Sequence, residues 1–245
     1  MSSADKIKAI VLTWDRSRAI TDHMILQYER LWPDHPFVFH IPFQNLPGRE
    51  TERTRYFKTP APIKATVLQL LEGLDDEEWV YWAVDDKYPI ELVTNKITEL
   101  IADALRSPDM SGLMFCRCRV TLDSPKLSLY PKKKVNPSGD VYFERKAWYQ
   151  IWIHQLLRVK VLRHLFGHMP DNIPSAKQMD KLKDEVPKLA EHHLFVTEKN
   201  FAIFGESTNR GAITQNCYES IRATGIELPE WFREPNGKHV TLGKL

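Results

Sequence analysis

Apolar, β-branched runs alternate with amphipathic segments through the first half of this chain. Residues 7–13 (IKAIVLT) are almost continuously apolar, as is typical of a strand buried on both faces of a sheet. Residues 17–31 then carry apolar side chains at helical spacing, and Pro33 follows where the helix has to stop. Alternation of this kind predicts β-α-β units, which build a mostly parallel sheet with helices on both faces.

The same rhythm continues to about residue 120. It predicts strands over residues 37–41, 79–84 and 113–120 and helices over residues 63–74 and 94–105. Residues 42–60, which contain Pro47 and Gly48, are expected to form a loop. The fold class that follows is α/β, a single Rossmann-like domain with a central sheet flanked by helices.

The second half of the sequence is less regular. Residues 121–139 contain several Pro and Gly residues and the run 132–134 (KKK), so a loop is expected there. Residues 146–166 are expected to form one long helix that carries Trp148 and Trp152 one turn apart. The remaining expected elements are short strands over 141–143 and 201–204, a helix capped by Ser175 and running to residue 186, and a helix over 214–223.

Length and charge restrict the class of protein. The 245 residues, of which 42% are hydrophobic, suit one domain with residues 1–120 and 121–245 as its two halves. Thirty-four basic residues against thirty-two acidic ones leave a net charge of +2, which argues against a nucleic-acid partner. The sequence has no apolar run of 18 residues and no apolar N-terminal stretch typical of a secretion signal. We therefore expect a cytoplasmic protein whose three cysteines are reduced and buried.

Two adjacent carboxylates, Asp85 and Asp86, end the expected strand over residues 79–84. Burying such a pair costs free energy unless a cation meets it. Ligands of open α/β sheets bind at the carboxyl ends of the strands, where this pair would lie. A divalent cation that joins one carboxylate to a diphosphate explains the placement. The alternative is that one aspartate caps the next turn and the other is solvated.

Two further polar segments follow expected strands. Thr13, Asp15, Arg16 and Arg18 lie where the chain turns into its first helix, whose N-terminus offers backbone donors to a phosphate. An N-cap with both arginines in solvent is the simpler alternative. Residues 204–214 (FGESTNRGAIT) include Glu206, Ser207 and Arg210, which could hold sugar hydroxyls or a diphosphate, or could form a surface turn.

The strand that ends in Asp85 and Asp86, together with the first strand of the IVLTWDR type, resembles the DXD region of GT-A glycosyltransferases. The resemblance is specific near residues 13–18 and 79–89 and follows the order of elements over most of the chain. It implies a GT-A fold and transfer of a sugar from a nucleotide-diphosphate sugar to a hydroxyl of a glycan or polysaccharide. Asp86 would hold Mn²⁺ or Mg²⁺ and the diphosphate, and Asp85 the ribose or donor sugar.

Lys87 departs from the acidic or small residue often found beside this motif. A lysine at this position can neutralise phosphate charge itself and so take part of the metal's role. Whether the reaction would invert or retain the anomeric configuration stays open.

An inverting enzyme of this kind also needs a general base. Asp171 and Asp180, which follow the expected long helix, are the candidates, with a solvated position among lysines as the alternative for Asp180. Trp148 and Trp152 could stack on the acceptor sugar or belong to the core. His192 and His193 could contribute a metal ligand or form a surface pair.

Two other functions remain as alternatives. A nucleotidyltransferase of similar fold normally carries a glycine-rich loop after its first strand, and the segment TWDRSRAI lacks one. A non-catalytic carbohydrate-binding protein is the other. No GxGxxG or Walker loop occurs, which argues against a dinucleotide-dependent oxidoreductase and a P-loop kinase. Residues 132–134 are interpreted as solvated, with peripheral contact to anionic lipid or a charged acceptor as the alternative.

Overall fold

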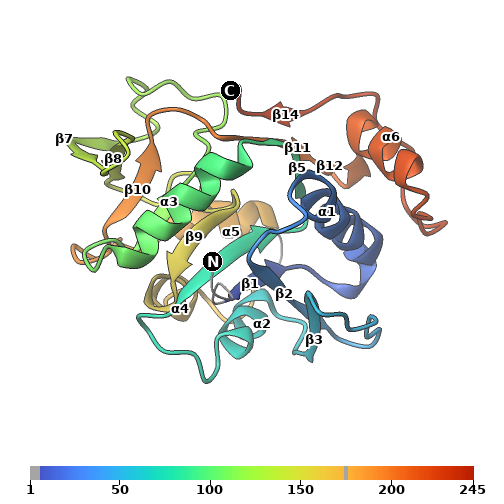
Figure 1. Cartoon of the computed structure of the whole chain (residues 1–245). Helices are drawn as coiled ribbons and strands as arrows, with labels where there is room; N and C mark the ends of the chain where they lie inside the picture. The colour runs from blue at the N-terminus through green and yellow to red at the C-terminus, as the bar shows by residue number, and fades with distance from the viewer. Residues whose placement is uncertain (1–5, 174–175) are drawn as a thin grey trace.

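A nine-stranded sheet forms the centre of the fold, which we describe from a computed structural model covering residues 6–173 and 176–245 (Figure 1). Its strands are β1 (Ile7–Leu12), β2 (Phe37–Phe43), β3 (Thr54–Lys58), β4 (Trp79–Val84), β6 (Gly112–Met114), β7 (Leu129–Val135), β8 (Val141–Arg145), β9 (Gln155–Arg158) and β10 (Leu194–Thr197). Their order across the sheet is β3-β2-β1-β4-β9-β6-β10-β8-β7. The strands β3, β2, β1 and β4 run parallel, whereas β9 and β8 are antiparallel to their neighbours. The predicted α/β class is confirmed, but the sheet is mixed rather than mostly parallel.

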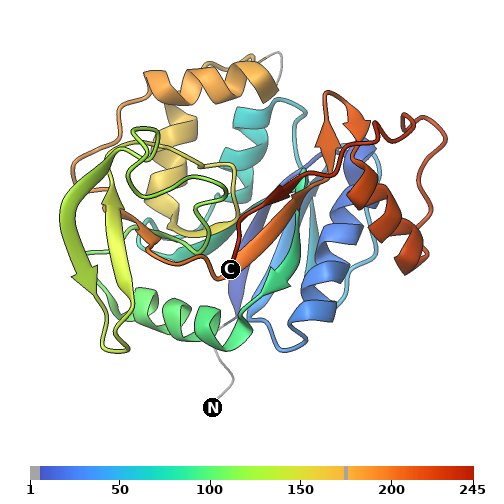
Figure 2. The same cartoon turned by 90° about the horizontal axis from the view of Figure 1, so that it is seen from above.

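Helices cover both faces of this sheet (Figure 2). One face carries α1 (Arg18–Leu31), α3 (Thr94–Arg106) and α6 (Gln215–Thr224), and the other α2 (Ile63–Leu70), α4 (Val159–Gly167) and α5 (Ala176–Leu182). Strand β4 packs against the helices on both faces of the sheet. Tyr81 and Ala83 belong to the apolar cluster on the face of α1, and Val80 and Trp82 to the cluster on the face of α2. This two-sided burial explains why the strand has no polar residue until it ends.

A second, three-stranded sheet lies beside the first. It consists of β5 (Lys87–Leu92), β11 (Ala202–Glu206) and β14 (Thr241–Leu242), in the order β14-β11-β5 and all antiparallel. Only two residues separate the end of β4 from the start of β5, so the turn Asp85–Asp86 joins the two sheets. A small hairpin of β12 (Thr208–Asn209) and β13 (Ala212–Ile213) follows β11.

The expected long helix over residues 146–166 is wrong. The chain instead makes turns over residues 146–154, where Gln150 has φ of 56°, and then forms β9 and α4. All four residues of β9 are buried between β4 and β6. Apolar spacing in QLLRVKVL fits a buried strand as well as a helix, and pairing with distant strands decides the outcome.

Other expectations near the sheet edges also need correction. The expected loops over residues 42–60 and 121–139 contain strands β3 and β7, and the expected strand over residues 113–120 stops at Met114. Residues 132–134 therefore belong to the edge strand β7, with Lys133 and Lys134 over the rings of Phe143 and Phe195. Lysines on an exposed edge oppose pairing with another chain. The predicted cap Ser175 lies outside the described residues.

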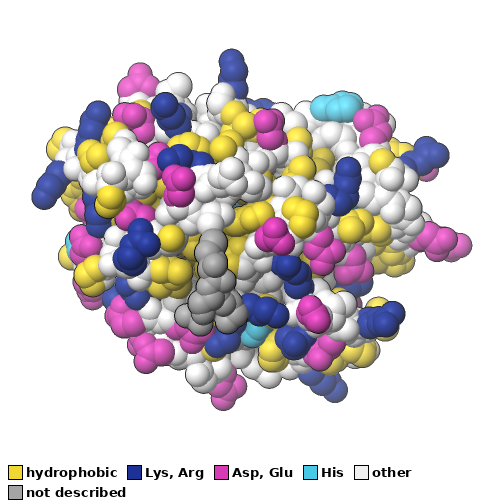
Figure 3. All heavy atoms as spheres, viewed as in Figure 1, with side chains coloured by type: hydrophobic (Ala, Val, Ile, Leu, Met, Phe, Trp, Pro, Cys, Tyr) yellow, Lys and Arg dark blue, Asp and Glu magenta, His cyan; other side chains and the backbone are white. Residues whose placement is uncertain are grey.

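Charge and thiol placement agree with the composition. Acidic and basic side chains are interspersed over the face seen in Figure 3, without a large area of one sign. Cys116, Cys118 and Cys217 are free and buried, as predicted. None of the helices in the described part of the chain combines the length and apolarity needed to cross a bilayer.

A buried hydrogen-bond chain fixes the end of β4. The Nε2 atom of His154 lies 2.9 Å from the carbonyl oxygen of Val84 and must donate to it, so Nδ1 accepts from the hydroxyl of Tyr28 at 2.7 Å. The hydroxyl of Tyr28 in turn accepts from Tyr81 at 2.8 Å. Burial is the main cause that lowers the pKa of His154 to about 4. The imidazole is thus neutral, and its geometry sets the position of the turn that follows Val84.

This arrangement predicts stability that falls in acid. Because the folded pKa of His154 is below the unfolded value of about 6.5, the folded state binds fewer protons between pH 6.5 and 4, and its free energy of unfolding falls over that range. His154→Gln should lower the free energy of unfolding at pH 7 by about 1–3 kcal/mol and flatten its pH dependence. Urea denaturation from pH 4.5 to 8 measures both, with exposed His239→Gln as the matched control. An unchanged slope in His154→Gln would contradict the assignment.

Candidate active site

The strand order places a topological switch point, the position of the ligand crevice in open α/β sheets, at the carboxyl ends of β1 and β4. After β1 the chain builds outward through β2 and β3, and it then returns to place β4 on the other side of β1. At such a switch point the connections leave in opposite directions and open a ligand site. Thr13 follows β1 and Asp85 follows β4, and the Oγ1 of Thr13 donates to Oδ2 of Asp85 at 2.8 Å. The two strand ends are therefore linked by side chains that lie in the crevice.

Asp85 is held in an environment that disfavours its charge. Burial raises its pKa to about 7, and the neighbouring charge of Asp86 adds to this effect. Hydrogen bonds from the hydroxyls of Thr13 and Ser17 and the charge of Lys87 act in the opposite direction. Asp85 thus changes charge near neutral pH, which is a common property of residues at functional sites.

Lys87 lies between two carboxylates. Its Nζ is 2.8 Å from Oδ2 of Asp86 and 3.6 Å from Oε1 of Glu206. The backbone dictates this arrangement, because Lys87 and Glu206 are paired residues in the β5–β11 ladder. Burial disfavours the ammonium, but the two carboxylates outweigh it and raise the pKa of Lys87. The lysine is therefore charged at neutral pH although its side chain is only 8% exposed.

Asp86 keeps one oxygen free. Its side chain is 41% exposed, yet Oδ1 is itself buried and has no hydrogen-bond partner among residues 6–173 and 176–245. A buried carboxylate oxygen without a donor costs free energy. A ligand that brings a hydroxyl or amine hydrogen to Oδ1 would remove that cost.

The segment after β11 completes the cluster. The backbone N of Ser207 donates to the carbonyl oxygen of Asp86 at 2.7 Å, and its Oγ donates to that of Asp85 at 3.2 Å. Gly205 lies against Tyr88, where a Cβ atom would collide with the ring. The hairpin then turns at Arg210 and Gly211, which have φ of 53° and 78°, so Arg210 is exposed at its tip. The turn interpretation of this segment is correct for Gly211. Ser207 shows that the segment also contacts the backbone of the turn Asp85–Asp86.

Asp15 and Arg18 act on a neighbouring loop. The carboxylate of Asp15 accepts hydrogen bonds from the backbone N atoms of Gln44, Asn45 and Leu46 at 3.0, 2.7 and 3.1 Å. Arg18 donates to the carbonyl oxygen of Leu46 at 3.0 Å. Both side chains therefore position the loop that follows β2 at the carboxyl edge of the sheet.

Arg16 lies in an exposed aromatic stack that sequence reasoning missed. Its guanidinium is 5.5 Å from the ring centre of Trp14 and 4.8 Å from that of Trp231, and Trp231 stacks on Phe232 at 4.7 Å. Trp14 directly follows Thr13, so the stack begins next to the carboxylate cluster. A tryptophan that directly follows a predicted buried strand was the sequence signal available for Trp14. No sequence signal marked Trp231 as its neighbour.

The predicted acceptor residues have different outcomes. Trp148 is wrong as a stacking residue, because it is 2% exposed and its Nε1 donates to the carbonyl oxygen of Val186. Trp152 is partly exposed and donates from Nε1 to Oδ1 of Asp180 at 2.8 Å. The two tryptophans do not share a helix, since β9 and α4 only begin after them.

The two candidate bases lie outside the cluster. Lys183 contacts Oδ1 of Asp180 at 3.1 Å, and Lys64 contacts that of Asp171 at 2.8 Å. The hydrogen bond from Lys64 lowers the pKa of Asp171, which makes it a weaker proton acceptor. Within the described ranges, neither carboxylate hydrogen-bonds or ion-pairs with Asp85, Asp86 or Lys87.

The residues present do not fit a divalent cation in their observed arrangement. Both carboxylates have protein partners, and the described residues hold no group of three His, Cys, Asp or Glu side chains that could bind a metal ion. His192 and His193 cannot assist, because they precede β10, whose start pairs with the start of β6 at the opposite edge of the sheet from Asp86. His192 is also buried, which lowers its pKa to about 4.

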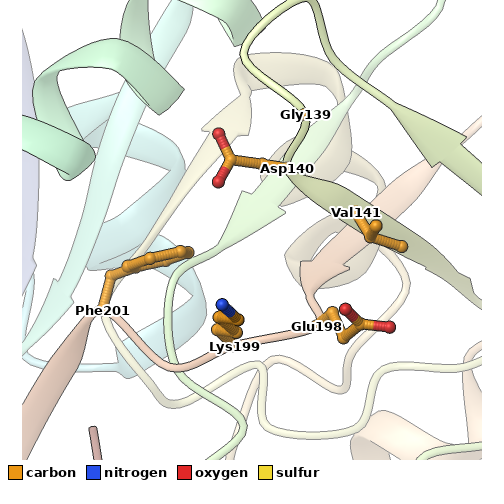
Figure 4. A pocket seen from close by; sticks show the side chains of 6 residues that line it. All are labelled: Gly139, Asp140, Val141, Glu198, Lys199 and Phe201. Atoms are coloured by element: carbon orange, nitrogen blue, oxygen red, sulfur yellow. The ribbon is translucent and has the colours of Figure 1, made fainter.

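Two hollows lie apart from this cluster. One, of about 140 Å³, is lined by the β7–β8 turn and the β10–β11 connection, with Asp140, Lys199 and Phe201 around it (Figure 4). The other, of about 310 Å³, lies between β3 and α2. Neither shares a residue with the cluster formed by Asp85, Asp86, Lys87, Glu206 and Ser207.

Comparison with known proteins reveals likeness in fold alone. No family model and no curated protein matches the sequence. The galactosyltransferase LgtC, in complex with donor and acceptor sugar analogues, is 14% identical with a TM-score of 0.40, over 78% of this chain and 68% of that one. The 4-diphosphocytidyl-2C-methyl-D-erythritol synthase from Anaerococcus prevotii is 9% identical with a TM-score of 0.43, and the match covers 92% of this chain and 99% of that one. A 2-C-methyl-D-erythritol 4-phosphate cytidylyltransferase from Thermus thermophilus is 11% identical with a TM-score of 0.44, and the match covers 90% of this chain and 100% of that one. These distances do not separate sugar transfer from nucleotide transfer.

Asp85 should reduce stability as the pH rises. With a folded pKa of about 7 and an unfolded value of about 3.9, the favourable contribution of the protonated carboxyl is complete below pH 3.9 and is lost as the pH rises through 7. Asp85→Asn should therefore raise the free energy of unfolding at pH 8 by about 1–3 kcal/mol and change it little near pH 4. Denaturant titrations at both pH values test this, with the exposed Asp34→Asn as control. A gain of equal size at both pH values would contradict the explanation.

Proposed function

We propose that this protein is a glycosyltransferase that moves a sugar from a nucleotide-diphosphate sugar to a hydroxyl of a glycan or polysaccharide. The observation that carries the proposal is the turn of Asp85, Asp86 and Lys87 at the carboxyl end of β4, joined to Thr13 at the switch point of the sheet. This crevice is where open α/β sheets bind ligands. The partly exposed carboxylate of Asp86 and the fixed ammonium of Lys87 suit a ligand with both hydroxyls and phosphates.

The proposed donor would span the crevice between the two strand ends. Its nucleoside would lie along the β1 side, where Trp14 offers an aromatic face and Arg16 a cation. Its sugar would lie toward Asp86 and Glu206, whose oxygens accept hydrogen bonds from hydroxyls. Asp15 and Arg18 would contribute by positioning the loop after β2 rather than by direct contact.

Transfer would break the bond between the anomeric carbon and the diphosphate oxygen. The electron pair leaves with the diphosphate, and the acceptor oxygen bonds to the anomeric carbon while its proton passes to a base. Positive charge near the leaving group lowers the barrier, because negative charge grows there in the transition state. For an inverting reaction Asp180 is the better candidate base, since Trp152 orients its carboxylate, and Lys64 lowers the pKa of Asp171.

The path of the chain after β1 favours sugar transfer over nucleotide transfer. The segment Asp15–Ser17 forms a single 3₁₀ turn that leads directly into α1. A nucleotidyltransferase of similar fold normally carries a glycine-rich loop after its first strand, and residues 13–20 (TWDRSRAI) contain no glycine.

A donor panel tests the proposal. The protein should release a nucleoside diphosphate from at least one of UDP-, GDP-, ADP-, CDP- or dTDP-linked sugars when oligosaccharide acceptors are present. Asp86→Ala should lower that rate by about 100-fold or more, since the carboxylate would contact the donor.

The controls separate the alternatives. Asp34→Asn should retain the full rate. Pyrophosphate release from a sugar phosphate and a nucleoside triphosphate would identify a nucleotidyltransferase instead. Glycan binding without turnover of any donor would identify a carbohydrate-binding protein. Full activity in Asp86→Ala would refute the site.

A further inference from the structure

The position of Lys87 bears on how a diphosphate would be held. We propose that the ammonium of Lys87, fixed between Asp86 and Glu206, takes the place of a divalent cation and binds the diphosphate of the donor directly. This inference rests on the proposed function and specifies its electrostatics. It makes the site independent of metal ions, in contrast to the Mn²⁺ or Mg²⁺ that the DXD-like pair implies.

One oxygen of each carboxylate in the turn is already engaged. Asp85 accepts from Thr13 at 2.8 Å, and Oδ2 of Asp86 is 2.8 Å from the Nζ of Lys87. Magnesium and manganese need several oxygen ligands arranged around one point. A metal ion on Oδ2 of Asp86 would have to displace an ammonium that the fold itself places there.

The backbone fixes the ammonium more firmly than a surface lysine. Lys87 is the first residue of β5, and its partner across the ladder is Glu206, so both ends of the contact belong to paired strands. Ser207 closes the same turn through its hydrogen bonds to the carbonyl oxygens of Asp85 and Asp86. A cation held in this way loses little conformational freedom when a ligand arrives.

Lys87 also has donors to spare. An ammonium carries three N–H groups, and Asp86 takes one of them. The 3.6 Å separation from Glu206 is longer than a hydrogen bond, so two donors remain for phosphate oxygens. Because two carboxylates share this single ammonium, a second cation would strengthen the site, and Arg210 at the exposed tip of the β12–β13 hairpin is the candidate.

Nucleotide affinity with and without metal tests the inference. Isothermal titration calorimetry with UDP, GDP, ADP, CDP and dTDP should find one that binds the full chain in EDTA, with a Kd that Mn²⁺ changes less than about threefold. Lys87→Met should weaken that binding by about 10- to 100-fold in EDTA, which is the usual effect of losing a charge-assisted hydrogen bond. Lys96→Met is the matched control, because that lysine on α3 pairs with Glu99 of the same helix and with Asp140 just before β8, away from the proposed site.

A second variant moves the affinity in the opposite direction. Glu206→Gln removes the competing carboxylate while it keeps the strand pairing, so it should tighten binding by at least about twofold, and it serves even if Lys87→Met fails to fold. Binding only in Mn²⁺, or undiminished binding by Lys87→Met in EDTA, would overturn the inference and leave the proposed function standing. Failure of all five nucleotides in both conditions would overturn the proposed function as well.

Discussion

The burial of β4 on both faces is the constraint on which the rest of this structure depends. All six of its residues are buried, and alternate side chains enter the two apolar clusters. A strand without a polar face is stable only in the interior of a sheet, so β4 lies between β1 and β9. The apolar run ends at Asp85, and the hydrogen-bond chain through His154 sets where that end lies. The site is thus located by the core rather than by the loops around it.

The chemistry of the site follows from placing charge beside such a core. Burial raises the pKa of Asp85 to near neutrality, whereas the charge of Asp86 is stabilised by contact with Lys87. In this arrangement the carboxyl of Asp85 readily changes charge and Oδ1 of Asp86 has no donor. The ammonium of Lys87 has hydrogens that no carboxylate accepts. Groups in this state gain more from a polar ligand than solvated groups do, because water is not competing for them. The same features that reduce the stability of the fold therefore make the crevice suited to binding.

Sequence patterns identified the elements whose local and tertiary preferences agree. Strand β4 coincides with its predicted bounds, and α1 and α3 differ from theirs by one residue at one end. Strand β9 was missed because its character comes from pairing with β4 and β6, which no local pattern records. At the site, the pattern placed Thr13 and Asp85 at strand ends, and the structure adds the hydrogen bond between them. The loop-holding role of Asp15 depends on partners distant in sequence, such as Leu46, and so could not be predicted. For Trp148 the spacing left stacking and core open, and contact with the distant Val186 decides for the core.

The place of β9 has a consequence for how the chain reaches its folded state. Strand β9 fills the gap between β4 and β6, yet it follows both of them in the sequence, after β7 and β8. During synthesis the parallel strands β1 to β4 can assemble first, but β4 then presents an unpaired, wholly apolar edge until residue 158 has emerged from the ribosome. Over that interval the strand that later carries the acidic turn is the part of the nascent chain most exposed to wrong pairing. Pairing with β9 covers the edge of β4 and so ends this period of exposure.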